Sequence, residues 1–321
     1  MEYCTNIFII FYLFAYLIKI PNFAIGTSHN LKQKTMGRFI NPFTDMGFKR
    51  IFGQEATKDL LIEFLNDLLV GEKQIKDIRF LDKELIPEYN EGRGIIYDVY
   101  CTTEEGEHFI VEMQNKSQIN FKERALYYLS SAIARQGIKG SEWMFDIKAV
   151  YGVFFMNFTL KDSPQKLKTD VMLLDRETYK TFSDKLRFIF IELPYFKKTE
   201  DECETDFERW IYVLKNMEIL DRMPFKAYKA AFEKLEKITD IAALSKEDRM
   251  KYDESIKVYR DIKATLAYSK KEGYDDGITK GREEGRKEGR MEVARIMKSR
   301  GMPIELIADI THISLDELEK L

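Results

Sequence analysis

The sequence predicts an α/β fold with a central mixed β-sheet, and three observations support this prediction. Between residues 55 and 158 the predicted elements follow the order helix, three strands, helix, strand, which is typical of a mixed α/β sheet. The run IKAVYGVFFMNF at 147–158 is continuously apolar, as expected for a strand that is buried on both faces. A hydrophobic content of 45% with 33% charged residues indicates a soluble globular protein.

The first predicted elements are a helix and a strand. Residues 55–70 carry apolar side chains at 60, 61, 64, 65, 68 and 69, the spacing of an amphipathic helix, and Gly71 ends it. Residues 75–86 alternate enough to predict a strand.

A β-hairpin is predicted next. Two β-type runs, 95–102 and 108–114, flank the charged turn 103–107, which contains a glycine. The second helix is predicted at 120–137, where Gly137 forms the cap. Its core positions are expected on successive turns, namely Leu126, Leu129, Ile133 and Gln136.

The hairpin carries one carboxylate in the middle of each apolar strand, Asp98 and Glu112. A charged carboxylate in an apolar strand is costly unless a cation compensates it. Side chains alternate across a strand, so Glu112, Gln114 and Lys116 share a face, and antiparallel pairing can place Asp98 beside Glu112. A hard divalent cation between the two carboxylates would remove their repulsion. The alternative is a pair of solvent-facing carboxylates on an edge strand.

Composition narrows the chemistry. The net charge of −3 gives no global electrostatic case for binding nucleic acid, so such binding needs a local basic patch. The three cysteines lie far apart without a CxxC pair, which favours reduced thiols in a cytoplasmic protein. The three histidines are equally scattered and predict neither a zinc cluster nor a Ser–His–Asp site. Any catalysis must therefore rest on carboxylates.

Residues 1–35 differ from the rest of the chain. The apolar run 6–18 is short for a membrane span, and no Lys or Arg precedes it as in a signal peptide. We favour a translation start at Met36, with a membrane anchor or a signal peptide as the alternatives. In this interpretation residues 36–195 form the core.

After residues 186–193, a further predicted strand, the chain turns helical. Helices are predicted at 206–217, 225–238 and 245–268, so that residues 196–268 form an accessory helical region covering the core. Short helices at 292–300, 303–311 and 314–321 follow, with Ser314 and Glu317 as a capping box. We expect the module at 301–321 to mediate interaction or dimerisation, with DNA contact as the alternative.

Between these helical regions, residues 269–300 form a charged segment in which glycine recurs every fourth residue, at 273, 277, 281, 285 and 289. Each glycine disfavours a helix by about 1 kcal/mol relative to alanine, so the regularity needs a reason. A row of glycines allows another helix to approach closely. Self-association or docking on the core is one interpretation, and a solvated charged linker is the other.

Taken together, these motifs resemble the PD-(D/E)XK nuclease superfamily, and more narrowly the bacterial family of recombination-promoting nucleases and transposases. The resemblance extends from Arg38 to the C-terminus. It rests on FINPFTDMGFKRIFG (39–53), EFLNDLL (63–69), IIYDVYC (95–101), IVEMQNK (110–116), ERALYYLSSAIARQ (123–136), WIYVLKN (210–216) and the glycine-periodic tail.

The resemblance implies a restriction-endonuclease-like αβββαβ core and hydrolysis of DNA that depends on Mg²⁺, or on Mn²⁺ or another divalent cation. Asp98 and Glu112 match the acidic positions, and the backbone carbonyl of Met113 would complete the metal ligands. Gln114 stands where the superfamily usually has Lys, although the family commonly carries Gln there. Gln114 would orient the attacking water. Lys116, on the same face of the strand, is the alternative residue to supply the positive charge of the missing Lys.

The expected function is therefore a metal-dependent DNA endonuclease of the transposase-like, recombination-promoting type. The alternative is a decayed DNA- or protein-binding member of the same fold. The expected phosphate contacts are Lys49, Arg50, Lys116, Lys122 and Arg124, with salt bridges such as Asp45–Lys49 as the alternative role. Glu63 is expected to be a surface residue, with an outer metal contact as the alternative. Tyr127 and Tyr128 are expected in the core, with base stacking as the alternative.

Overall fold

The computed structural model describes residues 37–85, 94–138, 140, 144–161 and 164–321. The expectations for the apolar run 6–18 and for a start at Met36 fall outside these residues. Within the described ranges, no helix is both long enough and apolar enough to cross a membrane.

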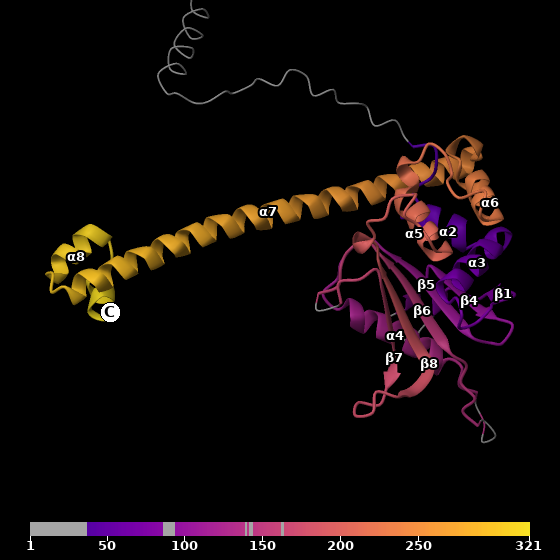
Figure 1. Ribbon diagram of the computed structural model, residues 1–321, viewed down its shortest axis with the longest axis horizontal. Coiled ribbons are helices and arrows are strands. Elements are labelled where there is room, and N and C mark those ends of the chain that lie inside the picture. Colours follow the sequence, from indigo (N-terminus) through magenta and orange to yellow (C-terminus); the bar gives the residue numbers. More distant parts are fainter. Residues whose placement is uncertain (1–36, 86–93, 139, 141–143, 162–163) are drawn as a thin grey trace, which may run out of the picture. The chain divides into compact units, whose positions relative to one another are not determined.

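In the described part of the chain, six strands form one mixed sheet in the order β1-β4-β5-β6-β8-β7 (Figure 1). The strands are β1 (Ile78–Phe80), β4 (Val99–Thr103), β5 (His108–Gln114), β6 (Val150–Met156), β7 (Lys168–Leu174) and β8 (Thr181–Glu192). β5 pairs antiparallel with β4 and parallel with β6, and β6 pairs parallel with β8. The predicted mixed α/β fold and its hairpin are confirmed.

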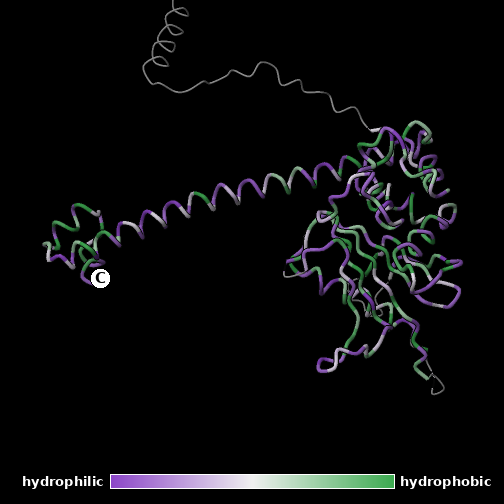
Figure 2. Tube along the Cα trace, viewed as in Figure 1, coloured by the Kyte–Doolittle hydropathy of each residue, from purple (hydrophilic) through white to green (hydrophobic). Residues whose placement is uncertain are grey.

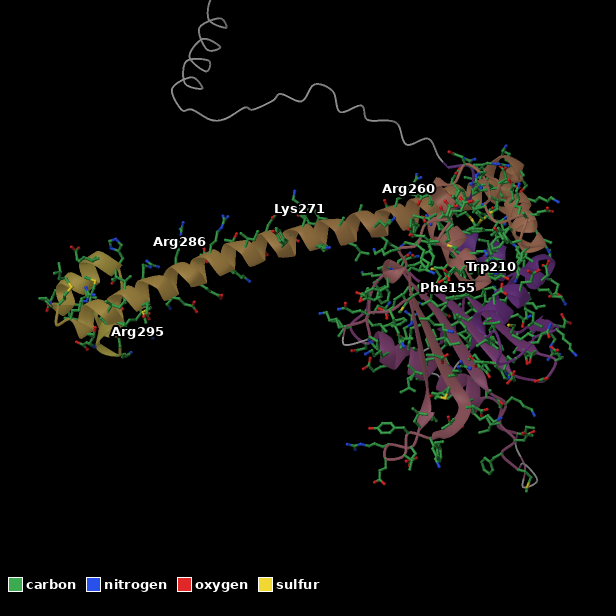
Figure 3. The ribbon with its side chains drawn as sticks, viewed as in Figure 1. Phe155, Trp210, Arg260, Lys271, Arg286 and Arg295 are labelled. Atoms are coloured by element: carbon green, nitrogen blue, oxygen red, sulfur yellow. The ribbon has the colours of Figure 1, made fainter. Side chains whose placement is uncertain are left out.

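Four helices cover one face of the sheet: α2 (Asp45–Phe52), α3 (Lys58–Leu68), α5 (Asp206–Asn216) and α6 (Ala230–Thr239). Their aromatic side chains meet those of β6 in a ring cluster. Phe64 lies 5.2 Å from Phe155 and 6.0 Å from Trp210 between ring centroids, and Figure 3 marks Phe155 and Trp210 in this core. Such aromatic pairs stabilise beyond the area that they bury.

Helix α4 (Phe121–Ala134) covers the opposite face. Its buried side chains are Phe121, Ala125, Leu129 and Ala132, so Leu129 is confirmed as a core position, and Ile133 is partly buried against the same cluster. Leu126 is 50% exposed, and Gln136 instead bonds the backbone of Lys148 through both ends of its amide. The helix lies close to β6 at Gly152, where an added Cβ would lie only 2.6 Å from the Leu129 Cδ1 atom.

Three elements differ from the sequence predictions. The predicted strand 95–102 is interrupted, so that β3 (Ile95–Ile96) pairs with β2 (Glu84–Leu85) in a separate ribbon. The edge strand β7 was not predicted, because its residues are mostly exposed and show no apolar alternation. The predicted helix 245–268, the glycine-periodic segment and the predicted helix 292–300 are one helix, α7 (Lys246–Ser299), of 54 residues.

Helix α7 is anchored at both ends and exposed between them. Near its start Tyr252 is buried, and its hydroxyl accepts a hydrogen bond from the Asn41 backbone N–H at 2.9 Å. At its end Ala294 packs with α8 (Ile304–Thr311) and α9 (Leu315–Glu319), and Ser314 caps α9 as predicted. The segment between is largely hydrophilic (Figure 2).

Candidate active site

The structure brings Asp98 and Glu112 side by side on the face of the sheet that α4 covers. Val99 pairs with Val111, so Asp98 and Glu112 are the next two facing residues of the β4–β5 hairpin. The Asp98 backbone N–H donates to Glu112 Oε1 at 3.1 Å. In return, the Met113 backbone N–H donates to Asp98 Oδ2 at 2.8 Å. Each carboxylate is thus held by the backbone beside the other.

The interruption between β3 and β4 is what frees Asp98 from the ladder. Tyr97 turns its ring under α4, where it packs against the ring of Tyr128. Its hydroxyl donates to the Tyr128 backbone carbonyl at 2.9 Å. The backbone N–H of Asp98 can therefore bond a side chain, whereas inside a regular strand it would bond a neighbouring strand.

Gln114 completes this group on the same face of β5. Its amide Nε2 donates to Glu112 Oε2 at 3.0 Å, so both oxygens of Glu112 accept a hydrogen bond. Gln114 is itself buried. A neutral amide fixes the orientation of Glu112 but does not neutralise its charge.

Burial makes this pair of carboxylates hold protons unusually well. Glu112 is only 2% exposed, and burial followed by repulsion from Asp98 raises its pKa to about 8. Burial likewise raises the pKa of Asp98. Both shifts report a cost of charging the site, which a cation bound between the carboxylates would relieve.

The donor set fits a hard divalent cation. The even-numbered residues of β5 turn their backbone groups toward β6, since His108 N–H bonds the Ala149 carbonyl and the Gln114 carbonyl accepts from Asn157 N–H. Met113 therefore turns its carbonyl to the other side, where its N–H already meets Asp98. Among the described residues no cluster of three or more acidic, His or Cys side chains could hold a metal. A cation here would have two carboxylates, a backbone carbonyl and water, as Mg²⁺ tolerates.

Two of the predicted phosphate contacts are engaged in salt bridges. Lys49 lies 2.7 Å from Asp45, the alternative that the sequence offered. Arg50 binds Asp248 at 3.0 Å and donates to the Ile238 carbonyl at 2.6 Å, so it ties α2 to α6 and α7. This set of partners indicates a structural role for Arg50.

The other three predicted contacts have no carboxylate within 4.0 Å among the residues that the structure describes. Arg124 donates to the Tyr128 hydroxyl at 2.9 Å and to Gln118 Oε1 at 3.2 Å, both neutral. Its charge acts on both Asp98 and Glu112, against the effect of burial. Lys122 is exposed on the same helix, while Lys116 lines a hollow beside Val258 and Asp261 of α7.

Glu63, Tyr127 and Tyr128 are the remaining side chains for which the sequence predicts a place or a role. Glu63 lies beside Lys229, Asp67 and Asp206, a charged group on α3, α5 and the start of α6. Tyr128 is packed as predicted, but Tyr127 is 52% exposed.

Lys83 is a neighbour of the site that the sequence did not reveal. Its carbonyl accepts from the Tyr97 N–H at 3.0 Å. Burial lowers the pKa of its side chain, and the Asp98 charge opposes this effect. No local sequence signal marks it, because it joins the site only through the β2–β3 ribbon.

Comparison with known proteins identifies the family of the chain. A family model described as PD-(D/E)XK nuclease family transposase matches residues 42–269, more than two thirds of the chain and all of the sheet. Neither the curated proteins nor the solved structures give a significant match. The order α3, β1, β4, β5, α4, β6 reproduces the αβββαβ core that the resemblance implied. The chain belongs to the PD-(D/E)XK nuclease family of transposases.

Proposed function

We propose that the protein is a DNA endonuclease that hydrolyses phosphodiester bonds with a divalent cation, in the manner of a recombination-promoting transposase-like nuclease. The observation that carries this proposal is the pairing of a buried carboxylate, Glu112, with a partly buried one, Asp98, each of which accepts a backbone hydrogen bond. A pair of solvent-facing carboxylates would not be 2% exposed at one member or fixed by backbone donors.

The residues of the site would have three different roles in this reaction. Asp98, Glu112 and the Met113 carbonyl would hold Mg²⁺ or Mn²⁺, which lowers the pKa of bound water and offsets charge on the phosphate. Gln114 would orient the attacking water by a hydrogen bond. Its neutral amide cannot act as a base toward that water or supply a positive charge near neutral pH. Arg124 would contact a phosphate beside the scissile one.

The alternative function is a decayed member of the family that binds DNA or protein without cutting. Gln114 in the place of the usual Lys favours it. The presence of both acidic residues, and the hydrogen bonds that their carboxylates accept from the backbone N–H groups of Met113 and Asp98, favour the enzyme.

Plasmid nicking by the full chain tests the proposal. We expect nicking with Mg²⁺ or Mn²⁺, none with EDTA, and none from the near-isosteric variants Asp98→Asn and Glu112→Gln. Glu177→Gln, an exposed carboxylate in the β7–β8 turn, is the matched control and should cut normally. Cleavage that survives in both site variants would place the chemistry elsewhere. DNA binding without any cleavage by the parent protein would establish the decayed alternative.

We also propose that the protein self-associates through the glycine row of α7. All five glycines have open space where a Cβ would be, and ridges of residues four apart pack against one another at about −50°. The residue after each glycine and the residue before it lie about 100° to either side of the row. The first set ends in three cations, Arg282, Arg286 and Arg290, and the second is mainly acidic, ending in Glu284 and Glu288.

This charge pattern favours a parallel pair. When two identical helices face each other in parallel about a two-fold axis, the basic side of one meets the acidic side of its partner. In an antiparallel pair like sides would meet and repel. Arg286 projects from the exposed stretch of α7, where a partner can reach it (Figure 3).

Light scattering and cross-linking test this association. Gly281→Leu should convert dimers to monomers, whereas Glu283→Leu, two residues along and away from the row, should not. In a Cys4→Ser background, Gly281→Cys and Gly285→Cys, two neighbouring positions of the row, should both form disulfide-linked dimers, and Cys101 and Cys203 do not interfere because they are buried. Cross-linking at neither position would contradict the parallel arrangement, and a monomeric parent protein would refute the association.

A further inference from the structure

A pocket of about 740 Å³ lies between β3 and the first two turns of α4, and one of its lining residues, Ile96, precedes Asp98 by two positions. β3 leads through Tyr97 directly to Asp98. The lining residues include Ile96 on the β3 side, Ile119 on the connection before α4, and Arg124 and Tyr127 on α4 itself. Its volume lies within the range of about 300–1,000 Å³ that small-molecule-sized groups occupy in proteins.

The α4 side of the pocket carries one cation, Arg124, and one carboxylate, Glu123. The Arg124 guanidinium carbon lies 4.9 Å from the centroid of the Tyr128 ring, and its Nε donates to the hydroxyl of that ring. Gln118 accepts from Nη1 and fixes the plane of the group. Since both hydrogen-bond partners of Arg124 are neutral, its charge is available to an anion.

The outer wall is apolar and aromatic although it faces solvent. Tyr127 is half exposed, and Ile96 and Ile119 are more exposed still. The backbone of a perfect duplex offers such side chains nothing, because its outer surface consists of phosphates and sugars. An unpaired nucleotide offers both a phosphate and the flat face of a base, and bases stack on exposed aromatic rings in proteins that bind single strands.

We propose that this pocket binds an unpaired nucleotide next to the scissile phosphate, with Arg124 on its phosphate and Tyr127 against its base. The preferred substrate is then DNA with a single-stranded segment at the cleavage point, and not an uninterrupted duplex. The position of this nucleotide next to a cleaved phosphate rests on the proposed nuclease function, but binding at the pocket does not require cleavage.

Fluorescence anisotropy with the full-length Asp98→Asn variant in EDTA tests the binding. The probes are one blunt duplex, the same duplex with a 5′ or a 3′ single-stranded extension, and the extension alone as DNA and as RNA. We expect an extended duplex to bind about tenfold more tightly than the blunt one, the effect of stacking one base. Adding Tyr127→Ala should remove this preference, whereas Tyr127→Phe, which keeps the ring, should preserve it.

Tyr268→Ala is the matched control, since Tyr268 is an exposed tyrosine on α7 away from the pocket. Equal binding of blunt and extended duplexes, or a preference that Tyr127→Ala leaves intact, would overturn the proposal. Stronger binding of the RNA strand than of the DNA strand would overturn the assignment to DNA. If the parent protein cleaves neither the plasmid nor the extended duplex with Mg²⁺ or Mn²⁺ while the Tyr127-dependent preference holds, the nuclease function is refuted and the nucleotide site stands. If nicking occurs without the preference, the nucleotide site is refuted and the nuclease function stands.

Discussion

The backbone N–H of Asp98 donates to a side-chain oxygen of Glu112, 14 residues further along the chain. The two acidic residues therefore do not merely lie on one face. The backbone of Asp98 is held by the side chain of Glu112, and the side chain of Asp98 is held by the backbone of Met113, so the hairpin and the site form together. A regular strand through residue 98 would use that N–H in the ladder and would leave Glu112 without this donor.

We predict a pH-dependent stability difference between the parent protein and Glu112→Gln, measured by thermal melting in EDTA. The folded pKa of Glu112 is raised to about 8 from an ordinary value of 4.5, because burial disfavours its charge. Between these values the unfolded chain binds fewer protons, so the parent protein loses stability as pH rises through that window and levels off above it. Gln has no such loss, so the melting temperature of Glu112→Gln should gain on the parent from pH 5 to pH 8.

Glu177→Gln provides the baseline for that comparison, because it removes an exposed carboxylate from a turn. A difference between the parent and Glu112→Gln that stays constant with pH would mean that Glu112 is charged throughout. Adding Mg²⁺ or Mn²⁺ at pH 8 should raise the melting temperature of the parent but not that of Glu112→Gln, since a ligand of the folded state stabilises it.

Much of this core could be predicted because its signals are local. The continuous apolar run of β6 and the glycine turn of the hairpin specify buried and paired strands directly. Antiparallel pairing alone then places Asp98 beside Glu112. The edge strand β7 could not be predicted in this way, because its partner, and not its own sequence, makes it a strand.

The surroundings of the site depend on long-range contacts, which a single sequence does not show. Arg50 looks like a phosphate contact until Asp248, 198 residues away, is seen to bind it. Lys83 reaches the neighbourhood of Asp98 through a two-residue ribbon that periodicity cannot detect. Five glycines lower the helix propensity of α7 and predict a division into segments, yet they do not interrupt the helix.

We predict opposite effects for two arginines that have the same predicted role in the sequence. Arg124→Gln should weaken DNA binding severalfold and lower the slope of log affinity against log salt concentration by about one, with little change in melting temperature. Arg50→Gln should leave DNA binding and its salt slope unchanged but lower the melting temperature, because it leaves Asp248 and the Ile238 carbonyl without their partner. We expect a loss of about 1–3 kcal/mol in the free energy of unfolding. Equal salt slopes for both variants would contradict this division.

Gly152→Ala should destabilise the protein by about 1–3 kcal/mol, measured by chemical denaturation. The added methyl group would lie 2.6 Å from Leu129 Cδ1 and 2.7 Å from Phe154 Cε2, which forces α4 away from the sheet. Ser130→Ala is the control, because Ser130 lies on the exposed side of the same helix. Alanine has the higher helix propensity, so this change should stabilise the protein by up to about 0.5 kcal/mol. Equal stability of the two variants would show that α4 does not pack on Gly152 as described.

Gln114→Lys should shift the pH profile of DNA cleavage toward lower pH. The amide of Gln114 lies 3.0 Å from Glu112 Oε2, and an ammonium group at that position would favour the charged carboxylate and lower the pKa of Glu112. Gln114→Ala removes a hydrogen bond that lowers the pKa of Glu112, so it should reduce cleavage about tenfold or more and move the profile toward higher pH, opposite to Gln114→Lys. Cleavage rates from about pH 5.5 to 9 with Mg²⁺ distinguish the two. A Lys variant that cuts with the profile of the parent would mean that residue 114 orients water only, and that the charge state of Glu112 does not limit the rate.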